Sequence, residues 1–187
     1  MLMNEHLKFL VSRNSAPKLT SPGPDADELA QMMSAALRAP DHARLRPWRF
    51  LTVSGERREA LGELLLQALL ARNPDADESA QTKARNAPLR APVVVVVICK
   101  LSEHPKVPHI EQRQSAACAA HGLLLGAEAL GYSGIWRTGD VAFDRPFMTS
   151  LGLAADEEIT GFVYLGTRDG KPKPLPEMNP EEFNQYW

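Results

Sequence analysis

An unbroken run of seven apolar residues, VVVVVIC at positions 93–99, limits the possible folds of this chain more than any other segment. Six of the seven are β-branched, and such side chains favour extended backbone. The run shows no alternation of apolar and polar residues, which predicts a strand that is buried on both faces. We therefore expect an α+β fold in which helices enclose a small sheet.

Hydrophobic periodicity and breaker residues place the other elements around this strand. Asp25 and Glu28 have the spacing of a capping box, and Gly131 is typical of the residue that follows a helix C-terminus. Residues 73–81 are polar, and the basic residues 83–90 lead into the central strand. Helices are predicted at residues 7–13, 25–39, 57–72, 110–130 and 146–151, and further strands at residues 49–53, 133–136 and 159–165.

The length of 187 residues suits one domain spanning residues 1–187. Its last part, residues 170–187, is rich in proline and ends in aromatic side chains, so it cannot pack on itself. We expect this C-terminal arm to wrap over its own domain or over a neighbouring subunit. Small residues such as Gly122 and Gly126 in the helix predicted at 110–130 allow close helix packing, and together with the arm they predict an obligate homodimer.

Charge and cysteine content exclude several classes of protein. The chain has 21 Lys and Arg against 23 Asp and Glu, a net charge of −2, which excludes a polyelectrolyte that binds nucleic acid. Cys99 and Cys118 are too few and too far apart for a redox pair or a zinc finger. The first eight residues show no signal-peptide pattern, and no apolar stretch is long enough to span a membrane, so we expect a soluble cytoplasmic protein.

Two basic segments are candidates for binding a ligand. Arg13, Asn14 and Ser15 follow the first predicted helix, and a guanidinium beside a hydroxyl can bind a phosphate; the alternative is an arginine that only complements the helix dipole. Arg38 and His42 lie in a loop bounded by prolines between a helix and a strand, where binding residues are often found. The alternative there is a solvated basic loop.

A third candidate lies at residues 134–139, where a predicted strand ends. Trp136, Arg137 and Thr138 stand between two glycines, so a stacking ring and a positive charge lie where a ligand can approach the backbone. The alternative is a strand end with a half-buried tryptophan. The sequence lacks the dinucleotide-binding and phosphate-loop fingerprints and a serine nucleophile motif, and no metal ligands have convergent spacing.

Together these segments resemble the nitroreductase family of flavoproteins, and specifically its short single-domain members. The resemblance implies a three-layer α/β/α sandwich with a small mixed or antiparallel sheet, in a dimer whose C-terminal arms lie on the partner. The segments that carry it are RNS at 13–15, RAPDH at 38–42 with PW at 47–48, KARNAP at 83–88, KVP at 106–108 with EQ at 111–112, GIWRTG at 134–139 and GFVYLGT at 161–167.

The resemblance also implies an activity and a cofactor. It implies an FMN-dependent oxidoreductase in which NADH or NADPH reduces the flavin and a nitroaromatic, a quinone or a similar small molecule then takes the electrons, by a ping-pong mechanism. No side chain need act as a catalytic residue, because the chemistry is that of FMN. The implied cofactor-binding residues are Arg13, Asn14 and Ser15 near the phosphate and ribityl chain, Arg38 and His42 from the partner subunit, and Trp136, Arg137 and Thr138 along the flavin.

One departure from the family pattern keeps other functions open. Many relatives have Arg-Arg-Ser near the N-terminus, and here Asn14 stands in place of the second arginine, so one charge is missing beside the phosphate. The alternatives are a non-redox dimer that binds a flavin or nucleotide for storage or sensing, and a flavin-dependent dehalogenase or cleavage enzyme of the same fold. The sequence identifies neither the acceptor nor a preference between NADH and NADPH.

Overall fold

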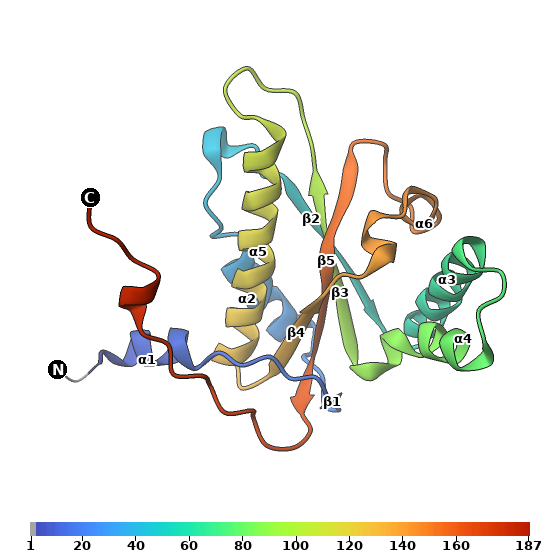
Figure 1. The fold of residues 1–187 in the computed structure, drawn as a ribbon, viewed down its shortest axis with the longest axis horizontal. Helices are drawn as coiled ribbons and strands as arrows, with labels where there is room; N and C mark the ends of the chain where they lie inside the picture. The colour runs from blue at the N-terminus through green and yellow to red at the C-terminus, as the bar shows by residue number, and fades with distance from the viewer. Residues whose placement is uncertain (1–2) are drawn as a thin grey trace.

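The computed structural model describes residues 3–187; Met1 and Leu2, part of the N-terminal segment searched for a signal peptide, lie outside the described residues. The fold is built on a wholly antiparallel sheet (Figure 1). The predicted apolar run forms β3 (Val93–Lys100), between β2 (Trp48–Ser54) and β5 (Glu157–Arg168). Val94 to Ile98 are fully buried, which confirms a central strand covered on both faces. The short strands β1 (Leu19–Thr20) and β4 (Ser133–Arg137) both pair with β5.

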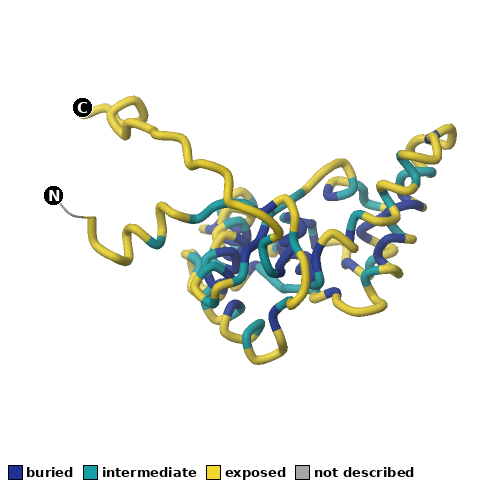
Figure 2. The backbone as a smooth tube through the Cα atoms, turned by 90° about the horizontal axis from the view of Figure 1, so that it is seen from below, coloured by how far each residue is buried: buried dark blue, intermediate teal, exposed yellow. Residues whose placement is uncertain are grey.

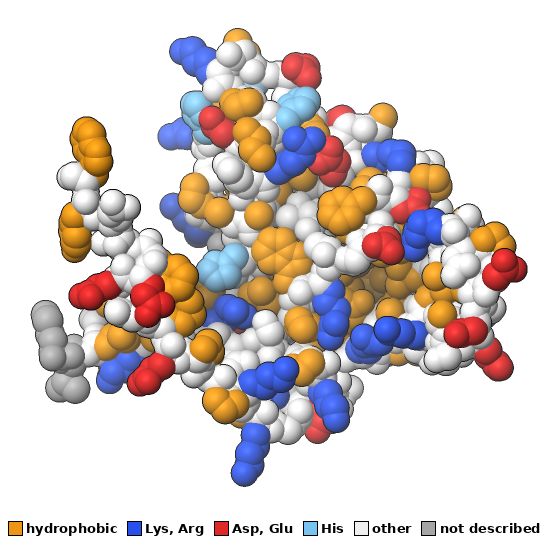
Figure 3. All heavy atoms as spheres, in the orientation of Figure 1, with side chains coloured by type: hydrophobic (Ala, Val, Ile, Leu, Met, Phe, Trp, Pro, Cys, Tyr) orange, Lys and Arg blue, Asp and Glu red, His pale blue; other side chains and the backbone are white. Residues whose placement is uncertain are grey.

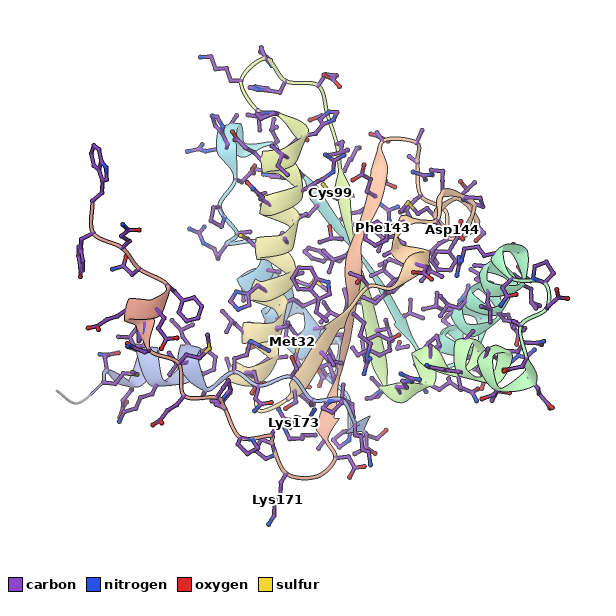
Figure 4. The ribbon with its side chains drawn as sticks, in the orientation of Figure 1. Met32, Cys99, Phe143, Asp144, Lys171 and Lys173 are labelled. Atoms are coloured by element: carbon purple, nitrogen blue, oxygen red, sulfur yellow. The ribbon has the colours of Figure 1, made fainter. Side chains whose placement is uncertain are left out.

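One face of the sheet is covered by α2 (Ala26–Ala36) and α5 (His109–Ala129). The Asp25–Glu28 capping box begins α2 as predicted. The two helices approach closely because α5 has glycine at the contact: a Cβ on Gly126 would lie 2.9 Å from the Cα of Met32 on α2, the residue labelled in Figure 4. The small residues therefore serve contact within the chain, and they no longer support the predicted dimer.

The other face is covered by α3 (Arg57–Arg72) and α6 (Arg145–Ser150), and α4 (Glu78–Arg85) packs on α3, so the predicted three-layer α/β/α sandwich is confirmed. Leu61 and Leu65 of α3 pack with Phe147 of α6 against the sheet. The sequence pattern named no helix between residues 73 and 90, where the structure has α4 beginning at Glu78. Short 3₁₀ helices complete the chain: η1 (His42–Arg44), η2 (Ala87–Arg90), η3 (Asp140–Phe143) and η4 (Pro180–Glu182).

The two ends of the described chain extend away from the sandwich on the same side (Figure 2). Helix α1 (Glu5–Ser12) has no buried residue, and its Leu7, Leu10 and Val11 are exposed. Every residue from 170 to 187 is exposed as well, including Trp187 at the C-terminus. Both segments thus present apolar side chains that the described part of the chain leaves uncovered. No helix within residues 3–187 combines the length and the apolar character needed to cross a bilayer.

Candidate functional site

The end of β4 borders a cavity of about 750 Å³ between the sheet and the α3–α4 pair. Trp136, Arg137 and Thr138, predicted together as ligand-binding residues, all line it. Leu65, Leu69, Ala84, Phe162 and Tyr164 add an apolar lining. Figure 3 shows a hollow with apolar side chains at this place, with Lys and Arg side chains along its lower border.

Trp136 is held in place by a glycine on the neighbouring strand. A Cβ on Gly161 of β5 would lie 1.9 Å from the Nε1 atom of Trp136, so only glycine leaves room for the indole ring. The ring covers this backbone so closely that Nε1 is buried and has no hydrogen-bond partner within the described chain. The sequence signal for this contact was Gly161 inside an otherwise apolar strand, which often marks a close approach.

Arg137 presents a hydrogen-bond donor without a protein partner at the cavity. Its Nε atom is buried and makes no hydrogen bond with any described residue, and its guanidinium carbon lies 5.9 Å from the ring centroid of Tyr164. Burial raises the pKa of the Tyr164 hydroxyl, and the charges of Arg137 and Arg90 partly oppose that rise. An uncompensated buried donor is costly, and such groups are frequent where a ligand binds.

Arg13, Asn14 and Ser15 lie beside the start of β4, because the adjacent Ala16 donates its backbone N–H to Gly134 O at 3.0 Å. The Nη1 atom of Arg13 donates to Ser15 Oγ at 3.4 Å, so the guanidinium and the hydroxyl lie side by side. The structure thus brings this segment to the same strand that carries Trp136.

The same region draws in two further parts of the chain. Arg168, at the end of β5, donates to Asn14 O at 2.6 Å, and the Asn14 amide donates to Lys173 O at 2.5 Å on the arm. Figure 4 shows Lys171 at the nearby bend, pointing away from the sandwich. Glu128 faces Arg13 and Arg168, and burial raises the pKa of its carboxyl. Sequence reasoning missed Arg168, Lys173 and Glu128 here, because tertiary structure alone joins them to Asn14.

Arg38 and His42 do not line this cavity. His42 Nδ1 lies 2.7 Å from Glu111 Oε2 near the start of α5, in the layer on the other face of the sheet. The loop that follows is unusual, since Ala43, Arg44 and Arg46 all have left-handed backbone with φ between 50° and 61°. One chain therefore leaves Arg38 and His42 outside this cavity, on the face of the sheet against which the Trp136 ring also packs.

A second cavity, of about 640 Å³, shares Trp136 with the first. Phe143, which is 79% exposed, lines it together with Cys99, and both are labelled in Figure 4. Burial raises the pKa of the Cys99 thiol to about 11, so the thiol stays protonated. Among the described residues, no group of three or more His, Cys, Asp and Glu side chains has an arrangement that could hold a metal.

Comparison with known proteins decides the family. The model of the Nitroreductase family matches residues 10–167 of the chain. The chain belongs to the nitroreductase family. It is 40% identical over 161 residues to "Putative NAD(P)H nitroreductase YdjA" of Escherichia coli K12, covering 86% of this chain and 87% of that protein.

Solved structures confirm the nitroreductase fold. The nitroreductase-like family protein of Bacillus cereus superimposes with a TM-score of 0.83 at 20% identity, covering 100% of this chain and 98% of its own. A nitroreductase of Bacteroides fragilis with bound FMN superimposes with a TM-score of 0.76 at 23% identity, covering 99% of this chain and 100% of its own. The family and fold predicted from the sequence are therefore correct.

Proposed function

We propose that this member of the nitroreductase family is an oxidoreductase that binds FMN and passes electrons from NADH or NADPH to a small-molecule acceptor such as a nitroaromatic or a quinone. When bound, FMN supplies hydride chemistry in two half-reactions, one with each substrate, which is a ping-pong scheme. The relatives support this proposal, since one is named an NAD(P)H nitroreductase and another holds FMN. Within the chain, the single observation that carries it is the unpartnered buried donor of Arg137 at the cavity.

The residues at the cavity fit a flavin ring. The polar edge of the ring has carbonyl oxygens and ring nitrogens that accept hydrogen bonds, and Arg137 offers a donor that no described protein atom uses. Gly139 has a φ of +83°, and no atom lies within 4 Å of the place that a Cβ would occupy there, so the backbone after Thr138 is open to a close approach. Trp136 borders the cavity at the same strand end, while its ring, fixed over Gly161, packs with residues on the α2–α5 face of the sheet.

The phosphate end of the cofactor fits the Arg13–Ser15 segment. A guanidinium and a hydroxyl that converge, as Arg13 and Ser15 do, can bind a phosphate with charge-assisted hydrogen bonds. Asn14 lies between them in the sequence; its amide nitrogen donates to Lys173 O, and its side-chain oxygen would be the group that faces the ribityl chain. Glu128 nearby carries negative charge when ionised, so Arg13 and Arg168 must together outweigh it in holding the phosphate.

Arg38 and His42 would reach the flavin of a second copy of the chain. Their separation from the cavity of their own chain supports this assignment, as do the exposed apolar residues of α1 and of the 170–187 arm. A partner subunit would cover Leu7, Val11 and Trp187, which are exposed among residues 3–187. On this proposal residues 1–187 form one domain and half of each of two sites.

An FMN titration followed by quenching of flavin fluorescence tests the proposal. We expect saturable quenching with wild-type protein and at least tenfold weaker binding with Arg137→Gln, since a charge-assisted hydrogen bond contributes about 1.5–3 kcal/mol. Arg85→Gln is the matched control, because Arg85 pairs with Glu63 on the surface and does not line the cavity. Wild-type protein that quenches no flavin fluorescence would rule the proposal out.

Subunit mixing tests the shared site. Arg137→Gln and the double variant Arg38→Ala/His42→Ala should each be nearly inactive alone. After unfolding and refolding together, mixed dimers would contain one site with all its residues, so activity should return to about a quarter of wild type, given random pairing of equal amounts. No recovery, despite mixed dimers seen by native mass spectrometry, would place Arg38 and His42 outside the partner's site.

A further inference from the structure

Positive charge gathers on one border of the large cavity. Four of its lining residues are cationic, Arg72, Lys83, Arg90 and Arg137, and one is acidic, Asp140. Arg72 is neutralised by a salt bridge to Asp144, which Figure 4 labels. Within the described chain, the salt bridges include none from Lys83, Arg90 or Arg137 to a carboxylate.

The two cationic residues of α4, Lys83 and Arg85, have different surroundings. Arg85 forms a salt bridge with Glu63 of α3, with Nε and Oε1 2.7 Å apart. Lys83, two residues earlier, lies on the cavity instead and has no such partner among the described residues. Arg90, at the end of η2, lies close to Tyr164, which also lines the cavity. The charge of Arg90 acts to lower the pKa of the Tyr164 hydroxyl, while burial raises it. Lys83 and Arg90 thus direct uncompensated charge toward the same cavity.

Lys83 and Arg90 also mark the boundary between two compartments. They are the two residues that line both the large cavity and an adjoining cavity of about 490 Å³. The adjoining cavity is polar, with Ser79, Thr82 and Asn86 as neutral hydrogen-bonding groups and Glu78 as its carboxylate. The large cavity beyond them is lined mainly by apolar side chains.

We propose that the electron acceptor is a flat apolar molecule that carries an anionic group, and that Lys83 and Arg90 bind this group while the apolar body lies in the part of the cavity next to α3–α4, between these helices and the flavin. An aromatic carboxylate has this chemistry. The inference rests on the proposed function, because it takes the flavin to lie along Trp136–Thr138. It adds the class of the acceptor and two residues that select it.

A matched pair of acceptors tests this inference. Para-nitrobenzoate and para-nitrobenzyl alcohol differ mainly in charge. In both reactions the nitro group takes up two electrons and two protons and loses water to become a nitroso group, while NADPH is oxidised to NADP⁺. We expect the wild-type kcat/KM to be about tenfold higher for the anionic acceptor than for the neutral one, because each exposed cation can raise the affinity for an anion by up to about fivefold. In Lys83→Gln/Arg90→Gln the two acceptors should have equal kcat/KM. Arg85→Gln should keep the wild-type ratio.

A binding measurement separates this inference from the proposed function. Isothermal titration of benzoate into FMN-free protein should show binding that Lys83→Gln/Arg90→Gln abolishes and Arg85→Gln retains. If the protein binds no FMN, the proposed function fails and this titration still decides the anion site. Equal kcat/KM for both acceptors in wild type, or no benzoate binding, would overturn the inference.

Two other results would also overturn it, by giving the cations to a different ligand. If Lys83→Gln/Arg90→Gln raises the KM for NADPH but not for NADH and leaves the acceptor ratio unchanged, the anion is the phosphate of the donor. If the double variant instead weakens FMN binding itself, measured by fluorescence quenching, the two cations hold the cofactor.

Discussion

Replacement of Gly161 by alanine is expected to displace the Trp136 ring from the site. The added Cβ would lie 1.9 Å from Nε1, 2.6 Å from Cδ1 and 3.0 Å from Cε2 of that indole. Contacts between such atoms normally lie at about 3.5 Å or more, so the ring must move by roughly 1.5 Å. The backbone of β5 cannot yield instead, because it pairs with β3 on one side and with β4 along residues 162–166.

This displacement should weaken both folding and FMN binding. Forcing atoms into a packed site costs about 1–3 kcal/mol, and a cost of about 2 kcal/mol lowers the melting temperature of a chain this size by about 4–8 °C. Circular dichroism would measure the melting temperature, and fluorescence quenching the affinity for FMN, which we expect to fall at least tenfold because Trp136 lines the cavity.

A double-mutant cycle shows whether the effect passes through Trp136. Trp136→Ala removes the atoms that the new methyl group would meet, so Gly161→Ala should cost almost nothing in that background, a coupling of about 2 kcal/mol. If Gly161→Ala leaves the melting temperature and the FMN affinity of wild-type protein unchanged, or costs the same with and without Trp136, then Gly161 does not hold the ring.

Three further changes have defined outcomes. The Glu157 carboxylate accepts two hydrogen bonds from Arg49, at 2.6 and 2.7 Å, which lower its pKa from 4.5 to about 2. Glu157→Gln should therefore lower the free energy of unfolding by about 2 kcal/mol at neutral pH, and this loss, measured by urea unfolding, should shrink as the pH falls from 4.5 to 2. A loss that stays constant over this pH range would contradict the prediction. Gly126→Ala should destabilise by about 1–3 kcal/mol in the same assay, because its Cβ would press on the α2 backbone at Met32, and wild-type stability would refute that contact. Arg13→Ala should weaken FMN binding more than riboflavin binding, while an equal loss for both would place Arg13 away from the phosphate.

Local signals predicted most of the fold. The apolar run of β3, the capping box of Asp25 and Glu28, and the bounds of α3 all depend on residues close in sequence, and all were correct. Helix α4 was missed because none of its residues is buried, so its sequence shows no apolar face. The glycines of α5 were predicted to pack closely, but which helix they meet depends on tertiary structure, and that helix is α2 of the same chain.

The site was predictable only where its residues are adjacent in sequence. Trp136, Arg137 and Thr138 form one strand end, and the structure places them together on a cavity. Gly161 and Tyr164 were not predicted, since they join the site through the pairing of β5 with β4. Arg38 and His42 do not line this cavity, and their assignment to the partner's site came from the family resemblance rather than from any local pattern.

The visible absorption spectrum before and after anaerobic addition of NADPH or NADH tests the central proposal most directly. We predict that the purified protein, supplied with FMN and passed through a desalting column, retains the flavin bands. These bands should bleach when the nicotinamide nucleotide is added and should return when a nitroaromatic acceptor follows. Protein that emerges colourless, or that keeps its flavin bands unchanged with both nucleotides, would contradict the proposal that this chain is an FMN-dependent oxidoreductase.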